Sequence, residues 1–266
     1  MLLPPREYVE NFLQKHAFSK NEILSNVELL LVDARELIYR DYLEAERLMN
    51  EELMLNLFAS NKVGKSGPME LISSLSAELT EPEKLKLINQ AVARTASLAF
   101  PYLQQLSTSN TNARRSRAGT TFEALFERAL SIYGITFQNQ SSLGTGFYTR
   151  NNLGKKVDII VPGHGAYENA RMKCAVISLK TTLRERWQQV VEELSRSNVP
   201  HIYLATLDES VSKETVDVMK NYNITLVVRN SEKESKFAGF SSVEGFQEFF
   251  DETMPRMMSQ WPNYSN

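Results

Sequence analysis

The stretch that decides the fold is "VDIIV" at Val157–Val161, together with the later "AVISLKTTLRERWQQVVEEL" at Ala175–Leu194. Runs rich in valine and isoleucine predict buried strands, and the apolar spacing after the second run predicts a helix. Asp158 stands inside the first run, and Lys180 ends the second. These charged residues, with the arginines and glutamates of the following helix, belong either to a solvated surface or to an active site.

Strand and helix patterns continue on both sides of this stretch. We expect strands at 135–138, 156–161, 172–179, 201–204 and 224–228, and helices at 120–134, 182–195 and 212–221. Thr120 or Thr121 would cap the first of these helices, and Gly134 would end it. Strands separated by helices predict an α/β core in which right-handed crossovers join the later strands.

The part of the chain before this core has a different pattern. Apolar residues at helical spacing predict helices at 21–58 and 82–103, with a loop containing glycine and proline at 59–68 between them. The polar segment "STSNTNARRSRAG" at Ser107–Gly119 predicts a linker. We therefore expect a helical N-terminal region at 1–106 and a core domain at 107–266.

Composition is that of an ordinary globular protein, with 266 residues of which 42% are hydrophobic. No apolar run is long enough to span a membrane, and the N-terminus "MLLPPREYVENF" lacks the basic start and apolar stretch of a signal peptide. We therefore expect a cytoplasmic protein without membrane contacts. The formal net charge of −2 does not indicate a nucleic-acid partner, so any such partner must be inferred from local charge.

Cysteine and histidine usage excludes several kinds of site. Cys174 is the one cysteine, which excludes a disulfide within the chain and a multi-cysteine zinc site, and its apolar surroundings predict burial. The three histidines, His16, His164 and His201, are far apart and lack the spacing of metal ligands. Any metal would therefore be held by oxygen ligands.

Asp158 and Lys180 each place a charge at the end of an apolar strand. A lone buried carboxylate costs several kcal/mol, so Asp158 needs a metal, a lysine or solvent as partner. Adjacent strands would bring the two residues together, either as a structural ion pair or as a magnesium and water site. Glu123 on the preceding helix and Glu193 on the following one can converge on the same end of the sheet, which favours the second interpretation.

The order Asp158, then Ser178-Leu179-Lys180, then Glu193 resembles the variant PD-(D/E)XK active site of type II restriction endonucleases of the EcoRII, SsoII and PspGI group. The common form of that site has an acid two residues before the lysine. In the variant a serine or cysteine stands there, as Ser178 does, and the following helix supplies the missing carboxylate. The resemblance covers about 114–194, and it departs from the pattern at Val157, which stands where the family has proline.

The resemblance implies a PD-(D/E)XK nuclease core with a mixed central sheet flanked by helices, plus a helical N-terminal region that clamps DNA or forms dimer contacts. It also implies Mg²⁺-dependent hydrolysis of DNA that leaves 5′-phosphate ends. Asp158 and Glu193 would hold Mg²⁺, Lys180 would orient or deprotonate the attacking water, and Glu123 would complete the acidic cluster. Spacing alone does not separate Glu193 from its neighbour Glu192.

The triplet Arg184-Glu185-Arg186 resembles the segment with which this family reads CC and GG half-sites. Arginine can donate two hydrogen bonds to guanine, and glutamate can accept one from cytosine. The resemblance therefore implies base recognition by these residues at a CCNGG or CCWGG site. The alternative is a solvated start of a helix, although arginines oppose the positive end of a helix dipole.

Two further features are candidates for DNA contact. Arg114, Arg115 and Arg117 would approach the DNA backbone or the minor groove, and the alternative is a basic loop on a linker. In relatives that flip a base pair, an aromatic residue from the N-terminal region holds the base. Phe58 is the candidate for such a pocket, with a helix core residue as the alternative.

Cutting both strands of a nearly palindromic site calls for two active sites, hence a homodimer, and a tetramer is possible. The implied partners are double-stranded DNA and, functionally, a cognate DNA methyltransferase. Two alternatives stay open: a structure-specific DNA repair nuclease of the same fold, and a non-catalytic DNA-binding protein. The presence of Asp158, Lys180 and Glu193 together argues against loss of catalysis.

Overall fold

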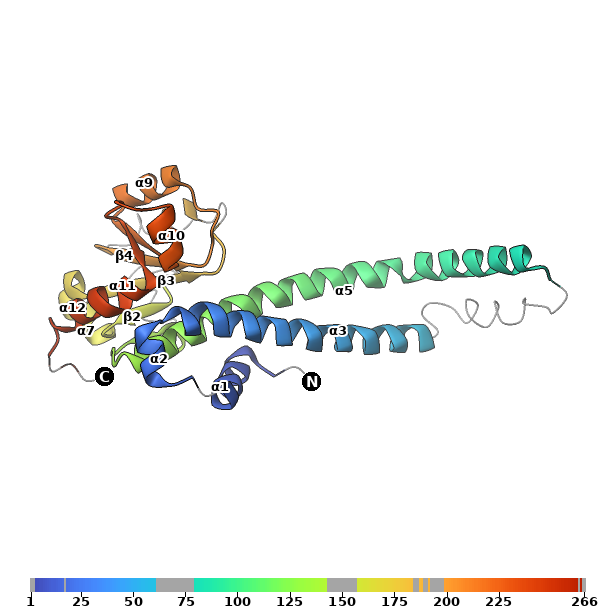
Figure 1. Ribbon diagram of the computed structural model, residues 1–266, viewed down its shortest axis with the longest axis horizontal. Coiled ribbons are helices and arrows are strands. Elements are labelled where there is room, and N and C mark those ends of the chain that lie inside the picture. Colours follow the sequence, from blue (N-terminus) through green and yellow to red (C-terminus); the bar gives the residue numbers. More distant parts are fainter. Residues whose placement is uncertain are drawn as a thin grey trace. The chain divides into compact units, whose positions relative to one another are not determined.

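The computed structural model describes residues 3–16, 18–60, 79–142, 157–183, 187–188, 191, 199–262 and 264 (Figure 1). The chain forms two compact units, one made of Met1–Leu3 with Tyr39–Arg117 and the other of Pro4–Ile38 with Ala118–Asn266. The units therefore separate after Arg117, later in the chain than the expected division between residues 106 and 107. Residues 4–38, expected in the helical region, belong to the unit that contains the sheet.

Within the described residues, the second unit is built on a mixed sheet of six strands in the order β1-β2-β3-β4-β5-β6. The strands are β1 Gln138–Asn139, β2 Ile159–Val161, β3 Ala175–Lys180, β4 Ile202–Thr206, β5 Ile224–Val228 and β6 Val243–Gly245. The first three strands pair antiparallel, and β3 to β6 pair parallel. The expected mixed sheet flanked by helices is confirmed.

The strands lie where the valine and isoleucine runs predicted them, but several begin or end at residues other than the expected ones. The expected strand at 224–228 coincides with β5. β3 begins at Ala175 instead of residue 172, because Arg171–Lys173 forms a short 3-10 helix, η4, after helix α7 at His164–Ala170. β1 lies at the far end of the expected strand at 135–138, and β2 occupies the second half of 156–161.

The sheet separates two apolar cores, because successive side chains of a strand point to opposite faces. On one face, Ile177 and Leu179 of β3 join a core with helix α1 (Pro5–His16), the C-terminal part of helix α5 (Glu81–Ile132) and the phenylalanines at 246–250. On the other face, Val176 joins a core with α7 and with helix α9 (Lys213–Asn221). The second unit is therefore a three-layer α/β structure.

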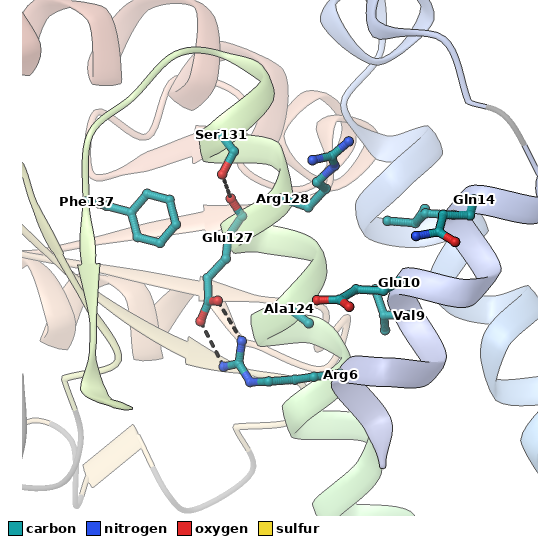
Figure 2. A pocket seen from close by; sticks show the side chains of 10 residues that line it. Arg6, Val9, Glu10, Gln14, Ala124, Glu127, Arg128, Ser131 and Phe137 are labelled. Atoms are coloured by element: carbon teal, nitrogen blue, oxygen red, sulfur yellow. Dashed lines mark hydrogen bonds and ion pairs between the residues drawn. The ribbon is translucent and has the colours of Figure 1, made fainter. Parts of the chain in front are cut away.

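Helices complete the second unit at both ends of its sequence. Figure 2 shows α1 beside the C-terminal part of α5, where Val9 and Ala124 belong to one apolar cluster. The remaining elements are α2 Lys20–Ser25, η1 Leu29–Ala34, α10 Asn230–Ser235, α11 Phe246–Glu248, η5 Phe249–Thr253 and α12 Met254–Met258. Tight aromatic contacts such as Phe126 with Phe250, whose ring centroids are 5.1 Å apart, fix α5 against the C-terminal segment.

The expected polar linker at Ser107–Gly119 is helical, as part of the single helix α5. Within the first unit, α5 runs beside helix α3 (Arg35–Ala59), and polar side chains join the two helices: Asn110 donates to Asn50 across 3.1 Å. The Thr108 hydroxyl donates to the carbonyl of Gln104 in the preceding turn. Polar composition suggested a loop, but tertiary pairing with α3 makes the segment a helix.

The two ends of the expected helix at 120–134 had different outcomes. Thr120 and Thr121 do not cap a helix, because α5 begins far upstream, at Glu81. Gly134 ends the helix as expected, with φ +70° in the left-handed region that glycine tolerates best. The amide of Ile135 donates to the carbonyl of Leu130 across 2.9 Å and closes the helix end.

Cys174 is buried, as expected, and burial raises the pKa of its thiol to about 11, which leaves it unreactive at neutral pH. In the described part of the chain no helix combines the length and the apolarity needed to cross a membrane.

Candidate active site

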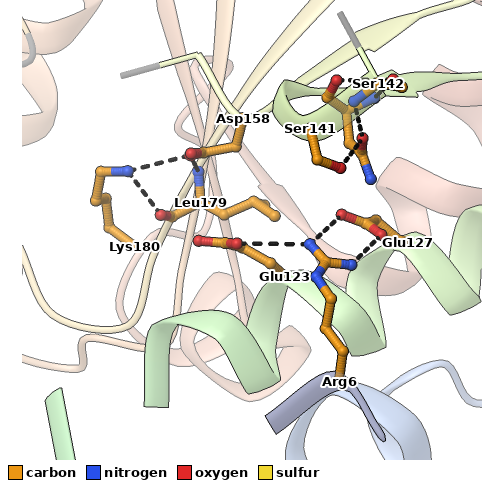
Figure 3. A network of polar contacts seen from close by, with 9 residues as sticks. Arg6, Glu123, Glu127, Ser141, Ser142, Asp158, Leu179 and Lys180 are labelled. Atoms are coloured by element: carbon orange, nitrogen blue, oxygen red, sulfur yellow. Dashed lines mark hydrogen bonds and ion pairs between the residues drawn. The ribbon is translucent and has the colours of Figure 1, made fainter. Parts of the chain in front are cut away.

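The expected meeting of Asp158 and Lys180 is confirmed (Figure 3). Asp158 directly precedes β2, Lys180 ends β3, and the two strands pair antiparallel with Ile159 opposite Ile177. This pairing puts the start of one strand beside the end of the other. Lys180 Nζ lies 3.1 Å from Asp158 Oδ2.

Asp158 is held by two groups at once. Its Oδ2 accepts the backbone N–H of Leu179 across 2.6 Å and the ammonium of Lys180, which also donates to the Leu179 carbonyl across 2.8 Å. The side chain of Asp158 is 12% exposed and that of Lys180 20%. Burial raises the pKa of Asp158, although Lys180, the Leu179 N–H and the Ser178 hydroxyl act to lower it. The carboxylate is therefore rigid, partly desolvated and responsive to any further positive charge.

Glu123, on α5, comes to the same end of the sheet and faces the Asp158–Lys180 pair (Figure 3). Burial and the negative charge of Asp158 raise the pKa of Glu123, while Arg6 and Lys180 lower it. The effect of Asp158 on its pKa means that the two carboxylates act on each other electrostatically. Two carboxylates near one ammonium form a center that gains stability from a cation.

Arg6 is a member of this network that the sequence analysis missed. Its guanidinium forms two hydrogen bonds with Glu127, of 2.6 and 2.9 Å, and lies 3.8 Å from Glu123. Glu123 and Glu127 stand one helical turn apart, and such a like-charged pair signals a need for a cation. Nothing in the sequence indicates that the cation comes from Arg6, which is 121 residues away from Glu127.

The donors present fit a hard divalent cation. Mg²⁺ binds oxygen ligands and is commonly held by one or two carboxylates, with water and phosphate oxygens completing its octahedron. Asp158 and Glu123 supply such carboxylates at the end of the sheet. Across the described residues, no group of three or more histidine, cysteine or acidic side chains is arranged to hold a metal by itself. A cation at this site would therefore need further oxygen ligands, either from the expected third carboxylate, Glu193, or from the substrate.

Several predicted site residues lie outside the described residues: Arg184, Glu185, Arg186, Glu192 and Glu193. Their expected roles stay predictions.

The structure does describe residues that neighbour them in the sequence, among them Leu183, Trp187 and Val191. Leu183, three residues after Lys180, donates its N–H to Asp208 Oδ2 across 2.6 Å. Trp187 packs against the apolar core that contains α7 and α9, and Val191 is buried in it.

The three arginines of the expected DNA-contacting cluster have different surroundings on α5. Arg114 pairs with the buried carboxylate of Glu46, with Nη2 2.6 Å from Oε1. Arg117 lies over the ring of Tyr42, at 4.7 Å from its centroid. Arg115 is exposed. The alternative of a basic loop is wrong, since all three are helical, and their contact with DNA stays a prediction.

Phe58 lies near the end of α3 and is 42% exposed. The alternative that it is a core residue is therefore wrong. Its expected role beside a flipped base stays a prediction.

Two comparisons by sequence lead to one group of proteins. The family model described as EcoRII C terminal matches residues 83–249. The type II restriction enzyme SsoII of Shigella sonnei is 34% identical over 198 residues, which cover 74% of this chain and 65% of SsoII. The type II restriction enzyme EcoRII of Escherichia coli is 32% identical over 133 residues, or 47% of this chain and 30% of EcoRII. The chain thus spans less than two thirds of either relative.

Solved structures show the same architecture. Metal-depleted Ecl18kI in complex with uncleaved DNA matches with a TM-score of 0.80 and 25% identity, over 100% of this chain and 82% of that one. The PspGI restriction endonuclease–substrate DNA complex matches with a TM-score of 0.54 and 18% identity, over 97% of this chain and 94% of that one, which shows the fold alone. The expected nuclease fold class is confirmed.

Proposed function

Because the chain belongs to the EcoRII C-terminal family, we propose that it is a type II restriction endonuclease, which hydrolyses double-stranded DNA at a specific site with Mg²⁺ and leaves 5′-phosphate ends. The resemblance inferred from the sequence is thereby confirmed at the level of the family. The observation that carries the proposal is the contact of Lys180 with Asp158 at the strand ends, with Glu123 facing it. A structural ion pair alone would not need the second carboxylate, which is unfavourable there.

Each part of the proposed reaction is assigned to particular residues of the chain. Asp158 and Glu193 would hold Mg²⁺, and Glu123 would complete the acidic cluster through a water or a second ion. When bound, the ion neutralises charge on the scissile phosphate. Lys180 carries an ammonium whose position is fixed by Asp158 and by the Leu179 carbonyl, so it can orient the attacking water; it would help to deprotonate that water only as the neutral amine, after losing its own proton.

Ser178 supports this variant of the active site. Its side chain is buried beside Asp158, at the position where the common form of the motif has an acid. A third carboxylate at this buried position would raise the electrostatic cost of the cluster. A serine avoids that cost and leaves the second ligand to come from Glu193.

Base recognition belongs to the same proposal. Arg184, Glu185 and Arg186 follow Lys180 closely in the chain, and they would read the CC and GG halves of a CCNGG or CCWGG site in the major groove. The short connection from the catalytic lysine would let correct base contacts align the cleavage center. Leu183, tied to Asp208, gives the start of this segment a fixed anchor.

A homodimer, with tetramers as a further assembly, would supply the two active sites that a double-strand cut requires. The first unit offers an apolar surface for a second copy, since large apolar side chains are exposed along both of its long helices. They include Leu48, Met49, Leu53, Leu55 and Phe58 on α3 and Leu85, Ile88, Val92, Leu98, Phe100 and Leu103 on α5. Exposed apolar surface of this extent is typical of an interface.

The biological setting follows from the activity. A restriction endonuclease acts in the cytoplasm, where the DNA is, and needs a cognate DNA methyltransferase that protects its own sites.

The test is digestion of phage and plasmid DNA of known sequence, with Mg²⁺ or with EDTA, followed by sequencing of the cut ends. Lys180→Ala is the catalytic variant, and Lys173→Ala, an exposed lysine just before β3, is the matched control. We expect discrete Mg²⁺-dependent fragments from the wild type and the control, none from Lys180→Ala, and ends at one CC…GG motif. Nicks at DNA structures would favour a repair nuclease, and binding without cleavage a non-catalytic DNA-binding protein.

A further inference from the structure

We propose that Arg6, on α1, is a positioning residue that holds Glu123 toward the Asp158–Lys180 pair and thereby strengthens divalent-cation binding at the site. The inference rests on the proposed function, since it assigns a role within that same active site. Within the described residues, Arg6 contacts Glu123 and Glu127 but neither Asp158 nor Lys180. Its effect on cation binding would therefore pass through Glu123.

The geometry places the Arg6 guanidinium between two carboxylates of α5, those of Glu123 and Glu127 (Figure 3). Both of its terminal nitrogens donate to Glu127, Nη1 across 2.6 Å and Nη2 across 2.9 Å. The same Nη2 lies 3.8 Å from Glu123 Oε2. The short pair fixes the guanidinium, and the longer contact directs its remaining positive charge at Glu123.

The charges explain why Glu123 needs this neighbor. Glu127 is 14% exposed, so water screens its charge poorly, and it stands one turn from Glu123 on the same face of α5. Asp158 approaches Glu123 from the sheet. Without Arg6, Glu123 would face the uncompensated carboxylate of Glu127 in addition to Asp158, and its side chain would turn toward solvent. That change removes an anion from the cluster that binds the cation.

Helix α1 is attached independently of Arg6. Val9 and Phe12 are buried in the apolar core, so the helix should stay in place when the guanidinium is removed. Beside Arg6, a cavity of about 500 Å³ is lined by residues that include Glu10, Gln14, Glu127 and Arg128 (Figure 2). Water can enter this space in a truncated variant, so the substitution need not distort the surrounding packing.

The experiment compares Mn²⁺ binding to the full-length wild type, Arg6→Ala, Arg6→Lys, Glu123→Gln and the double variant Arg6→Ala/Glu123→Gln by titration calorimetry. Mn²⁺ accepts the same oxygen ligands as Mg²⁺. Arg47→Ala is the matched control, because Arg47 on α3 also pairs with two glutamates, Glu44 and Glu51. Thermal unfolding of every variant establishes that it is folded.

We expect Arg6→Ala to weaken Mn²⁺ binding about tenfold, as loss of an outer partner of a metal ligand commonly does. Arg6→Lys should retain part of the affinity, since it keeps the charge but loses the two-pronged geometry. In the Glu123→Gln background the Arg6 substitution should have no further effect. The half-saturating Mg²⁺ concentration for DNA cleavage should shift in parallel, and Arg47→Ala should shift neither.

Unchanged or tighter binding in Arg6→Ala would overturn the inference, and so would an equal loss with and without Glu123. Undetectable Mn²⁺ binding by the wild type, with no shift in the Mg²⁺ requirement, would also refute it. The proposed function fails by a different result, the absence of cleavage by the wild type. Binding data that behave as expected in a protein that cuts no DNA would keep the positioning role and remove the nuclease.

Discussion

Substitution of Arg114 by alanine should destabilise the protein, in contrast to the same change at Arg115. Arg114 Nε lies 3.0 and 2.9 Å from the two carboxylate oxygens of Glu46, and Nη2 lies 2.6 Å from Oε1. The Glu46 side chain is 1% exposed, whereas that of Arg114 is 47% exposed. The buried carboxylate of Glu46 is thus covered by the partly exposed side chain of Arg114.

The magnitude lies between two limits. Removing one partner of a fully buried ion pair costs about 3 to 5 kcal/mol, and an exposed pair contributes about 0 to 1 kcal/mol. Removal of Arg114 would let water reach Glu46, so we expect a loss of about 1.5 kcal/mol in the free energy of unfolding. In a chain of this size that corresponds to a decrease of about 4 °C in Tm.

Acid pH provides a second measure of the same contact. Hydrogen bonding to Arg114 is the main cause that lowers the pKa of Glu46 below its ordinary value of 4.5. A lowered folded-state pKa contributes stability that is present above the unfolded pKa and is lost as the pH falls through the folded one. The wild type should therefore lose this contribution below about pH 4.5, and Arg114→Ala should lose less over the same range.

The assay is thermal and urea unfolding of the wild type, Arg114→Ala and Arg115→Ala, at neutral pH and at acid pH, with DNA binding measured as a function of salt. If Arg115 contacts a phosphate, its variant should keep its Tm and show a salt slope reduced by about one. Equal Tm values for the Arg114 variant and the wild type would refute the reasoning about Glu46.

Three further predictions concern other parts of the molecule. Asp158→Asn should abolish cleavage and raise Tm, because burial raises the pKa of Asp158 and the ionised form therefore costs folding free energy at neutral pH; a lower Tm would contradict this. Leu55→Lys on the exposed face of α3 should shift the protein toward monomer in sedimentation velocity, and an unchanged distribution would exclude that face from the dimer contact. Burial lowers the pKa of His201, so the unfolded chain takes up the proton first and the free energy of unfolding should decrease as the pH falls below about 6.5. His201→Asn should make this decrease smaller, and curves of unfolding free energy against pH that run parallel for the two proteins would rule this out.

The sequence predicted those features that depend on neighbouring residues. Valine and isoleucine runs located the strands from β2 to β5, and Gly134 marked the end of α5, because strand alternation and the left-handed conformation are local properties. The meeting of Asp158 and Lys180 was also predictable, since both stand at the ends of strands and buried charges need partners.

Local composition misled where distant contacts decide the structure. Ser107–Gly119 has the polar composition of a linker, yet it is helical where α5 runs beside α3 and Arg114 binds Glu46, 68 residues earlier. Arg6 reaches Glu127 across 121 residues of sequence. Both ion pairs depend on how helices pack against one another, and the spacing of apolar residues within a short segment does not predict that packing. The sequence by itself therefore determined the strands from β2 to β5 and the pairing of Asp158 with Lys180, and only the tertiary structure decided which cations stabilise the carboxylates around them.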